Sequence, residues 1–204
     1  MSMYKQVTNK PWETQGLLGG LDPRPSFAMP SEKLALFFFM AVVCVLFSLF
    51  TVTYYLRMEL GDWIPVNKPG LLWLNTGLLV LSSVFFQFSR AASKAGSLAR
   101  TRTLFLVGGM LALAFIAGQV MAWQQLSTQG YFLASNPANA FFYLMTGLHI
   151  AHLLGGLWVW SRAVLAMLRT EDIPQQALRI ELCTLYWHFL LLIWIALFAM
   201  LANT

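Results

Sequence analysis

Three histidines are the residues of this 204-residue chain whose type and spacing are best suited to chemistry. His149 and His152 lie three positions apart in one apolar stretch, so a helix places both on one face. His188 lies in a second apolar stretch. Imidazole is an axial ligand of haem iron, so one histidine from each stretch is a candidate pair. Neutral rings that hydrogen-bond to neighbouring helices or to lipid headgroups are the favoured interpretation, because only one such pair exists and aromatic bulk surrounds it.

No other residue type adds a reactive group to these stretches. Cys44 and Cys183 form no C-x-x-C pair, which argues against a zinc or thiol-redox site. We expect both to act as small buried hydrophobic residues. A proton path through a membrane needs ionisable groups at depth, and the apolar stretches carry no central Asp, Glu, Lys or Arg.

The elements that carry the histidines are long and apolar. Hydrophobic residues make up 58% of the chain and charged residues 10%, against roughly 25% in soluble domains. We predict an all-α, polytopic membrane helical bundle over residues 34–204, preceded by a cytoplasmic arm over residues 1–33. Its five transmembrane helices are expected at 34–56, 71–89, 103–125, 138–166 and 182–202. Asn136–Pro137 is typical of a helix start.

Charge placement predicts the orientation. Four cations lie in the arm, four in the second connection and three in the fourth, eleven in all, whereas the other side carries only Arg57 and Lys68. This asymmetry puts the N-terminus in the cytoplasm and the C-terminus outside. It also explains the basic pI near 9.5 better than nucleic-acid binding does, because the cations cluster at the ends of apolar spans.

Small and polar residues inside the spans predict how the helices pack. Two runs at four-residue spacing suit close backbone approach: Ala114, Gly118 and Ala122, and Gly147, Ala151 and Gly155. Asn75 and Ser82 share a face of the second span, and with Gln119 they are expected to hydrogen-bond across helix interfaces. Trp158, Trp160 and Trp187 are interpreted as an aromatic belt at the cytoplasmic side.

Three motifs carry a family resemblance, and they occur in family order over residues 63–194. They are WIPVNKPGLLWLNTGLLVLSS (63–83), TGLHIAHLLGG (146–156) and LYWHFLLLIW (185–194). They resemble the P-x-LNT-x-x-L-x-x-SS, TG-x-H-x-x-H-x-x-x-G and YWHF-x-x-x-x-W signatures of subunit III of the haem–copper respiratory oxidases. The chain is similar to a short, five-helix form of that family, lacking its first two helices.

The resemblance implies an accessory subunit of a bacterial terminal oxidase in the cytoplasmic (inner) membrane. Such a subunit has no catalytic residue and no haem, copper or other metal of its own. The complex reduces oxygen with electrons from cytochrome c or quinol and pumps protons, with haem and copper in partner subunits. The subunit packs against core subunit I and holds phospholipid there. The alternatives are a subunit-III-like protein associated with nitric oxide reductase or, from another class, a free-standing membrane cytochrome b or a transporter.

The resemblance also assigns expectations to single residues. Val43, Ala122 and Leu191 stand where the family has acidic residues, which argues against a carboxylate proton antenna. Glu181 matches the family's acidic residue seven positions before the histidine. The family's lipid-binding arginine falls between Arg162 and Arg169, so both are candidates for a phospholipid headgroup site. The three histidines are expected to be structural.

Overall fold

Five helices make up most of the part of the chain that the structure describes. The computed structural model describes residues 30–64, 70–169 and 173–203. The helices are α2 (Ser31–Met58), α3 (Leu71–Lys94), α4 (Leu98–Thr128), α5 (Pro137–Arg169) and α6 (Ile173–Asn203), and no strand occurs in these ranges. All five are long and apolar enough to cross a membrane. The prediction of an all-helical, multi-pass membrane protein is therefore confirmed.

The arm and the membrane helices are separate units. Residues 1–34 form one unit and residues 35–204 the other. Of the first unit the structure describes residues 30–34, of which 31–34 form the first turn of α2. Most of the predicted arm lies outside the described residues.

The helices extend beyond their apolar stretches. α3 runs five residues past the predicted end at Ser89, and α6 begins nine residues before the predicted start at Leu182. The added turns carry charged and amide side chains with good helix propensity. A helix also satisfies its own backbone hydrogen bonds, outside the hydrocarbon as well as inside it. A helix of 31 residues is about 46 Å long, which matches a bilayer with its headgroups rather than the hydrocarbon alone.

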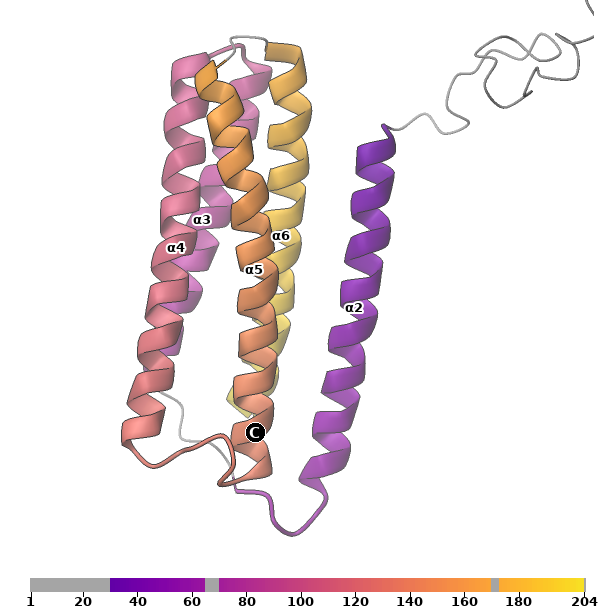
Figure 1. Cartoon of the computed structure of the whole chain (residues 1–204), viewed down its shortest axis with the longest axis vertical. Coiled ribbons are helices and arrows are strands. Elements are labelled where there is room, and N and C mark those ends of the chain that lie inside the picture. The colour runs from indigo at the N-terminus through magenta and orange to yellow at the C-terminus, as the bar shows by residue number, and fades with distance from the viewer. Residues whose placement is uncertain (1–29, 65–69, 170–172, 204) are drawn as a thin grey trace, which may run out of the picture. The chain divides into compact units, whose positions relative to one another are not determined.

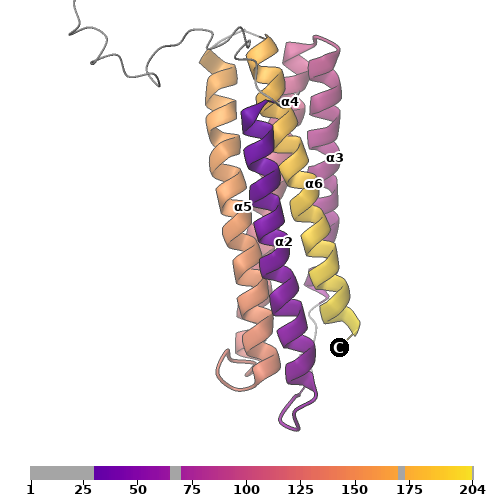
Figure 2. The ribbon, with the colours of Figure 1, turned by 90° about the vertical axis from the view of Figure 1, so that its right-hand side faces the viewer.

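Within the second unit, α3, α4, α5 and α6 form a four-helix bundle (Figure 1). α3 packs against α4 and α6, and α5 packs against the same two helices. α2 runs along α5 and α6 (Figure 2). Its side-chain contacts are aromatic: Phe47 lies 5.7 Å from the His152 ring and Tyr54 lies 5.7 Å from the Phe141 ring.

Glycine ends two of the helices. Gly96 after α3 and Gly130 after α4 have φ angles of 75° and 87°, a left-handed conformation that glycine adopts without penalty. The amide of Ser97 donates to the carbonyl of Ala92, and that of Tyr131 donates to the carbonyl of Leu126. Both ends are therefore Schellman motifs, which satisfy free carbonyls and turn the chain sharply.

Asn136 starts α5 as the sequence predicts. Its side-chain oxygen accepts a hydrogen bond of 3.1 Å from the amide of Ala138, and Pro137 is the first helical residue. The asparagine satisfies one of the amides that a helix start leaves unpaired. The helix start predicted at Asn136–Pro137 is confirmed.

Glycines allow large side chains to enter the helix interfaces. A Cβ at Gly109 of α4 would overlap the indole of Trp160 from α5, and one at Gly118 would overlap the Asn75 amide from α3. On α5, a Cβ at Gly156 would lie 2.9 Å from both Trp187 and Tyr186 of α6. Gly155 differs from its neighbour, because no other atom of the described chain lies within 4 Å of a Cβ placed there.

Other helices of this chain therefore cover only part of the predicted small-residue runs. Ala114, Ala151 and Gly155 are exposed, whereas Ala122 is buried. The close contact of α5 within the bundle is made one residue further on, at Gly156. Packing of Gly147, Ala151 and Gly155 against a partner helix stays a prediction.

Two further interpretations need correction. Trp187 is fully buried, so it belongs to the core rather than to an aromatic belt, whereas Trp158 is 63% exposed. Cys183 is buried as expected, but Cys44 is exposed on α2. Burial of each residue depends on whether it lies on the side of its helix that faces the bundle, and the residue type alone does not determine this.

Candidate functional site

Hydrogen bonds made by polar side chains connect the helices inside the bundle. Asn75 of α3 donates to Gln119 of α4 over 3.3 Å, and both residues are fully buried. Ser82 donates to the carbonyl of Gly108 over 2.7 Å. Trp194 of α6 donates its indole N–H to Thr76 of α3 over 3.0 Å. Because the bilayer offers no water, such bonds satisfy polar groups and fix which helix faces which.

His149 occupies the centre of the bundle. Its ring is fully buried, with its centroid 5.3 Å from the Trp194 ring and 6.0 Å from the Phe115 ring. Neither ring nitrogen has a hydrogen-bond partner among the described residues. The flat ring packs against aromatic side chains of α4 and α6, and this is where the structure places the first predicted histidine.

His152 and His188 share one local hydrogen-bond pattern. Nδ1 of His152 lies 2.8 Å from the carbonyl of Leu148, and Nδ1 of His188 lies 2.7 Å from the carbonyl of Thr184. A carbonyl only accepts, so Nδ1 carries the hydrogen in each ring and Nε2 of the neutral ring is an acceptor. His152 lies against Phe39 and Phe47 of α2, whereas His188 is exposed.

The structure does not bring the histidines of α5 together with His188. Tyr186 donates to the carbonyl of His152 over 3.1 Å, so that side of α6 faces α5. His188 follows two residues later, which is about 200° around the helix axis. In the described part of the chain, no group of three His, Cys, Asp or Glu side chains is placed to hold a metal ion. The geometry therefore offers no histidine pair that brackets an iron between α5 and α6.

Arginines gather at one end of the bundle, which we call the basic end. It is the end at which α3 and α5 finish and α4 and α6 begin, and it carries Arg90, Lys94, Arg100, Arg102, Arg162, Arg169 and Arg179. Arg90 pairs with Glu181 over 3.0 Å and joins α3 to α6. Both side chains are about one-third exposed, so the pair contributes little to stability by itself.

A cavity of about 910 Å³ opens at the basic end between α5 and α6. Arg162, Arg169 and Arg179 line it, together with Trp158 and apolar side chains such as Leu165 and Leu182. The Arg162 guanidinium lies 5.3 Å from the centre of the Trp158 ring. Guanidinium groups bind phosphate through paired N–H donors, and the apolar wall suits acyl chains. The cavity therefore has the chemistry of an anionic lipid site.

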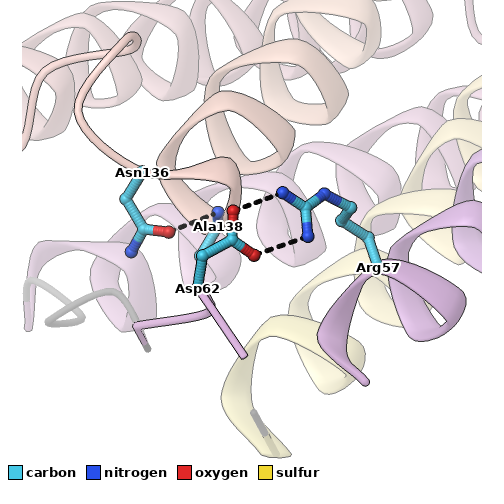
Figure 3. A network of polar contacts seen from close by, with 4 residues as sticks. All are labelled: Arg57, Asp62, Asn136 and Ala138. Atoms are coloured by element: carbon cyan, nitrogen blue, oxygen red, sulfur yellow. Dashed lines mark hydrogen bonds and ion pairs between the residues drawn. The ribbon is translucent and has the colours of Figure 1, made fainter. Parts of the chain in front are cut away.

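The opposite end is closed by an ion pair and an asparagine (Figure 3). Arg57 at the end of α2 donates two hydrogen bonds, of 2.6 and 2.5 Å, to the Asp62 carboxylate. This hydrogen bonding lowers the pKa of Asp62, with a smaller coulombic contribution from the same arginine. The Asn136 side chain donates to the carbonyl of Ile64 and so links the segment after α2 to the start of α5.

Sequence reasoning missed several of these residues. From the sequence, Arg179 is only one of the three cations counted in the fourth connection. That it lines the same cavity as Arg162 depends on how α5 packs against α6. Trp160 was interpreted as a belt residue, although its indole donates to the carbonyl of Phe105 inside the α4–α5 interface. A glycine pair, Gly108 and Gly109, was the available signal for such a close contact.

Comparisons with known proteins agree with the motifs. The family model described as "Cytochrome c oxidase subunit III" matches residues 29–202. The chain is similar to "Cytochrome c oxidase subunit 3" of Corynebacterium diphtheriae, with 31% identity over 65% of this chain and 64% of that protein, just under two thirds of its length. "Probable cytochrome c oxidase subunit 3" of Nocardia farcinica is 30% identical over 68% of this chain and 70% of its own length. "Cytochrome c oxidase subunit 3" of Synechocystis is 28% identical over 79% and 70%.

Proposed function

The chain belongs to the cytochrome c oxidase subunit III family, and we propose that it is a non-catalytic accessory subunit of a bacterial haem–copper terminal oxidase. In this role it binds the core subunit in the cytoplasmic membrane, stabilises it during turnover and holds lipid beside it. The complex reduces oxygen and pumps protons, with haem and copper in its other subunits. The names of the relatives favour an oxidase over a nitric oxide reductase as the partner complex.

One observation carries the proposal of an accessory role. The membrane interior of the chain is occupied by packing, because His149, Asn75 and Gln119 are fully buried among aromatic rings and helix contacts. Among the residues that the structure describes, the charged side chains lie instead towards the two ends of the helices. Such an arrangement supports a scaffold whose function is to present surfaces and hold lipid.

The haem content of the isolated chain tests this proposal against a membrane cytochrome. The purified chain is expected to show no Soret band. If it does show one, replacing His188 by Ala decides whether that histidine is an iron ligand. Loss of one haem equivalent from His188→Ala, with assembly intact, would show that the chain is a cytochrome.

We also propose that the cavity at the basic end holds the headgroup of an anionic phospholipid. Arg162 and Arg169 are the residues expected from the family pattern, and Arg179 lines the same cavity. Trp158 beside them suits the headgroup region. The proposed orientation, with the basic end in the cytoplasm, fits the same charges.

Mass spectrometry of co-purified lipid tests this site. Replacing Arg162 and Arg169 by Gln together should lower the anionic lipid retained per chain by several-fold, because two phosphate contacts are lost. Replacing Arg57 at the opposite end serves as the matched control. Equal retention in both variants would show that the cavity is not the lipid site.

A further inference from the structure

His188 is a polar residue on an outward face within the membrane-spanning part of α6. α6 runs from Ile173 to Asn203, which puts His188 fifteen residues, or about 22 Å along the axis, from either end. The side chain is exposed, and only its Nδ1 is bonded, to the carbonyl of Thr184 one turn earlier. Nε2 is left as an acceptor without a partner among the described residues. Along the axis, His188 is seven residues, or about 10 Å, from Glu181 at the basic end, and a short imidazole does not extend that far.

The contacts around His188 fix the face on which it lies. Trp187 is fully buried, and Tyr186 faces α5 through its bond to the His152 carbonyl. Thr184 donates to the carbonyl of Phe86 on α3 over 3.3 Å. His188 is one turn beyond Thr184, so it lies on the outer side of the groove between α3 and α6, away from α2 and α5.

Other polar side chains follow the same line towards the basic end. Gln87 on α3 comes directly after Phe86 and is exposed, although it lies within a membrane-spanning helix. The Arg90–Glu181 ion pair follows within a turn. We call Gln87, Arg90, Glu181 and His188 the α3–α6 polar strip. Exposed apolar side chains flank it, including Val80 and Leu192.

Hydrocarbon is a poor environment for His188 and Gln87, the two residues of the strip that lie inside the predicted spans. Lipid tails offer no hydrogen bond to an imidazole or an amide, so exposing these groups to lipid is unfavourable. Membrane proteins instead place polar side chains of this kind against another helix, where hydrogen bonds between helices satisfy them. The ring of His149, by contrast, is already enclosed by this chain's own aromatic side chains.

We propose that the α3–α6 polar strip is the surface on which a membrane-spanning helix of a partner subunit docks. The partner helix supplies a hydrogen-bond donor, from a hydroxyl, amide or indole group, to Nε2 of His188 within the membrane. This rests on the proposed function, since it assumes a partner in the membrane, and it adds which face binds and by which contact.

Photo-crosslinking locates the partner without altering the strip. Leu192 is 62% exposed one turn beyond His188, and Leu113 is 42% exposed at the midpoint of α4. Each is replaced by Cys in a Cys44→Ser background and labelled in native membranes with a short benzophenone maleimide. The expected result is a covalent adduct with another membrane protein from Leu192→Cys, at a yield several-fold above that from Leu113→Cys.

Other crosslinking outcomes would overturn the proposal. They are an adduct with lipid alone, an adduct with a second copy of this chain, or equal protein adducts at both positions. If a partner co-purifies with the chain but Leu192→Cys captures none of it, the docking face is wrong and the proposed function stands. If no partner co-purifies at all, the proposed function fails, and the docking surface fails with it.

A second measurement tests the hydrogen bond. Replacing His188 by Leu should lower recovery of the partner from detergent extracts by about three- to twenty-fold, the effect of one interhelical hydrogen bond. His188→Gln keeps an outward acceptor and should recover within threefold of wild type. The melting temperature of the isolated chain should not fall in His188→Leu, because the imidazole bonds only within its own helix. A fall there, or full recovery of the partner, would contradict the proposal.

Discussion

Replacing Gly109 by Ala is expected to destabilise the bundle, although alanine is the better helix former. The new methyl group would lie 2.6 Å from Nε1 of Trp160 and closer still to its ring carbons. The indole would have to move, and its 3.0 Å hydrogen bond to the Phe105 carbonyl would be lost. Both effects arise in the α4–α5 interface, where α4 is not free to withdraw because α3 packs on it as well.

The magnitude follows from three contributions. Overpacking of a tight interface costs roughly 1–3 kcal/mol. An indole N–H left without its partner costs about 1–3 kcal/mol more. The gain in helix propensity from Gly to Ala offsets roughly 1 kcal/mol. The net loss is about 1–5 kcal/mol, and for a chain of this size each kcal/mol lowers the melting temperature by about 2–4 °C.

Gly155→Ala is the matched control. It makes the same chemical change on α5, but the new methyl group meets no other atom of the described chain within 4 Å. Its melting temperature should therefore stay at or slightly above that of wild type. Unfolding can be followed in detergent with a thiol-reactive dye, since Cys183 is buried and the exposed Cys44 can be replaced by Ser. If Gly109→Ala melts no lower than Gly155→Ala, the close packing of Trp160 against α4 is refuted.

Three further predictions concern docking, pH and orientation. Gly155→Leu should lower recovery of the assembled complex far more than Leu165→Ala, and wild-type yield in pull-downs would show that this face meets lipid. The lowered pKa of Asp62 stabilises the fold above the carboxyl's ordinary pKa near 4, and this contribution is lost as the pH falls through the lowered value. The melting-temperature gap between wild type and Asp62→Asn should thus shrink between pH 7 and pH 3, and a constant gap would exclude the Arg57 pair as its source. A reporter enzyme that works only outside the cytoplasm should be active when it is fused to the C-terminus. One that works only in the cytoplasm should be inactive there.

The number and type of elements could be predicted from sequence, because a span of about twenty apolar residues has few solutions in a bilayer. The helix ends could not be predicted from the apolar stretches, because α3 continues to Lys94 through residues with good helix propensity that are polar enough to lie outside the hydrocarbon. The partners of single residues were also out of reach. Gly155 and Gly156 are neighbours in sequence, but a 100° step turns only Gly156 towards Trp187.

The histidines show the same limit within the candidate site. Their spacing correctly places His149 and His152 on neighbouring positions of one helix, yet it does not distinguish their surroundings. Phe115 and Trp194 enclose His149, whereas α2 supplies the rings beside His152. These contacts depend on residues more than 30 positions away, which no local pattern specifies.

The central claim is that this chain is an accessory subunit of a haem–copper oxidase, and purification of the tagged protein from native membranes in mild detergent tests it most directly. We expect the chain to co-migrate with a larger subunit, the complex to contain haem and copper, and both to stay with the larger subunit when the two are separated. Recovery of the chain without such a partner, or with haem bound to the chain itself, would contradict it.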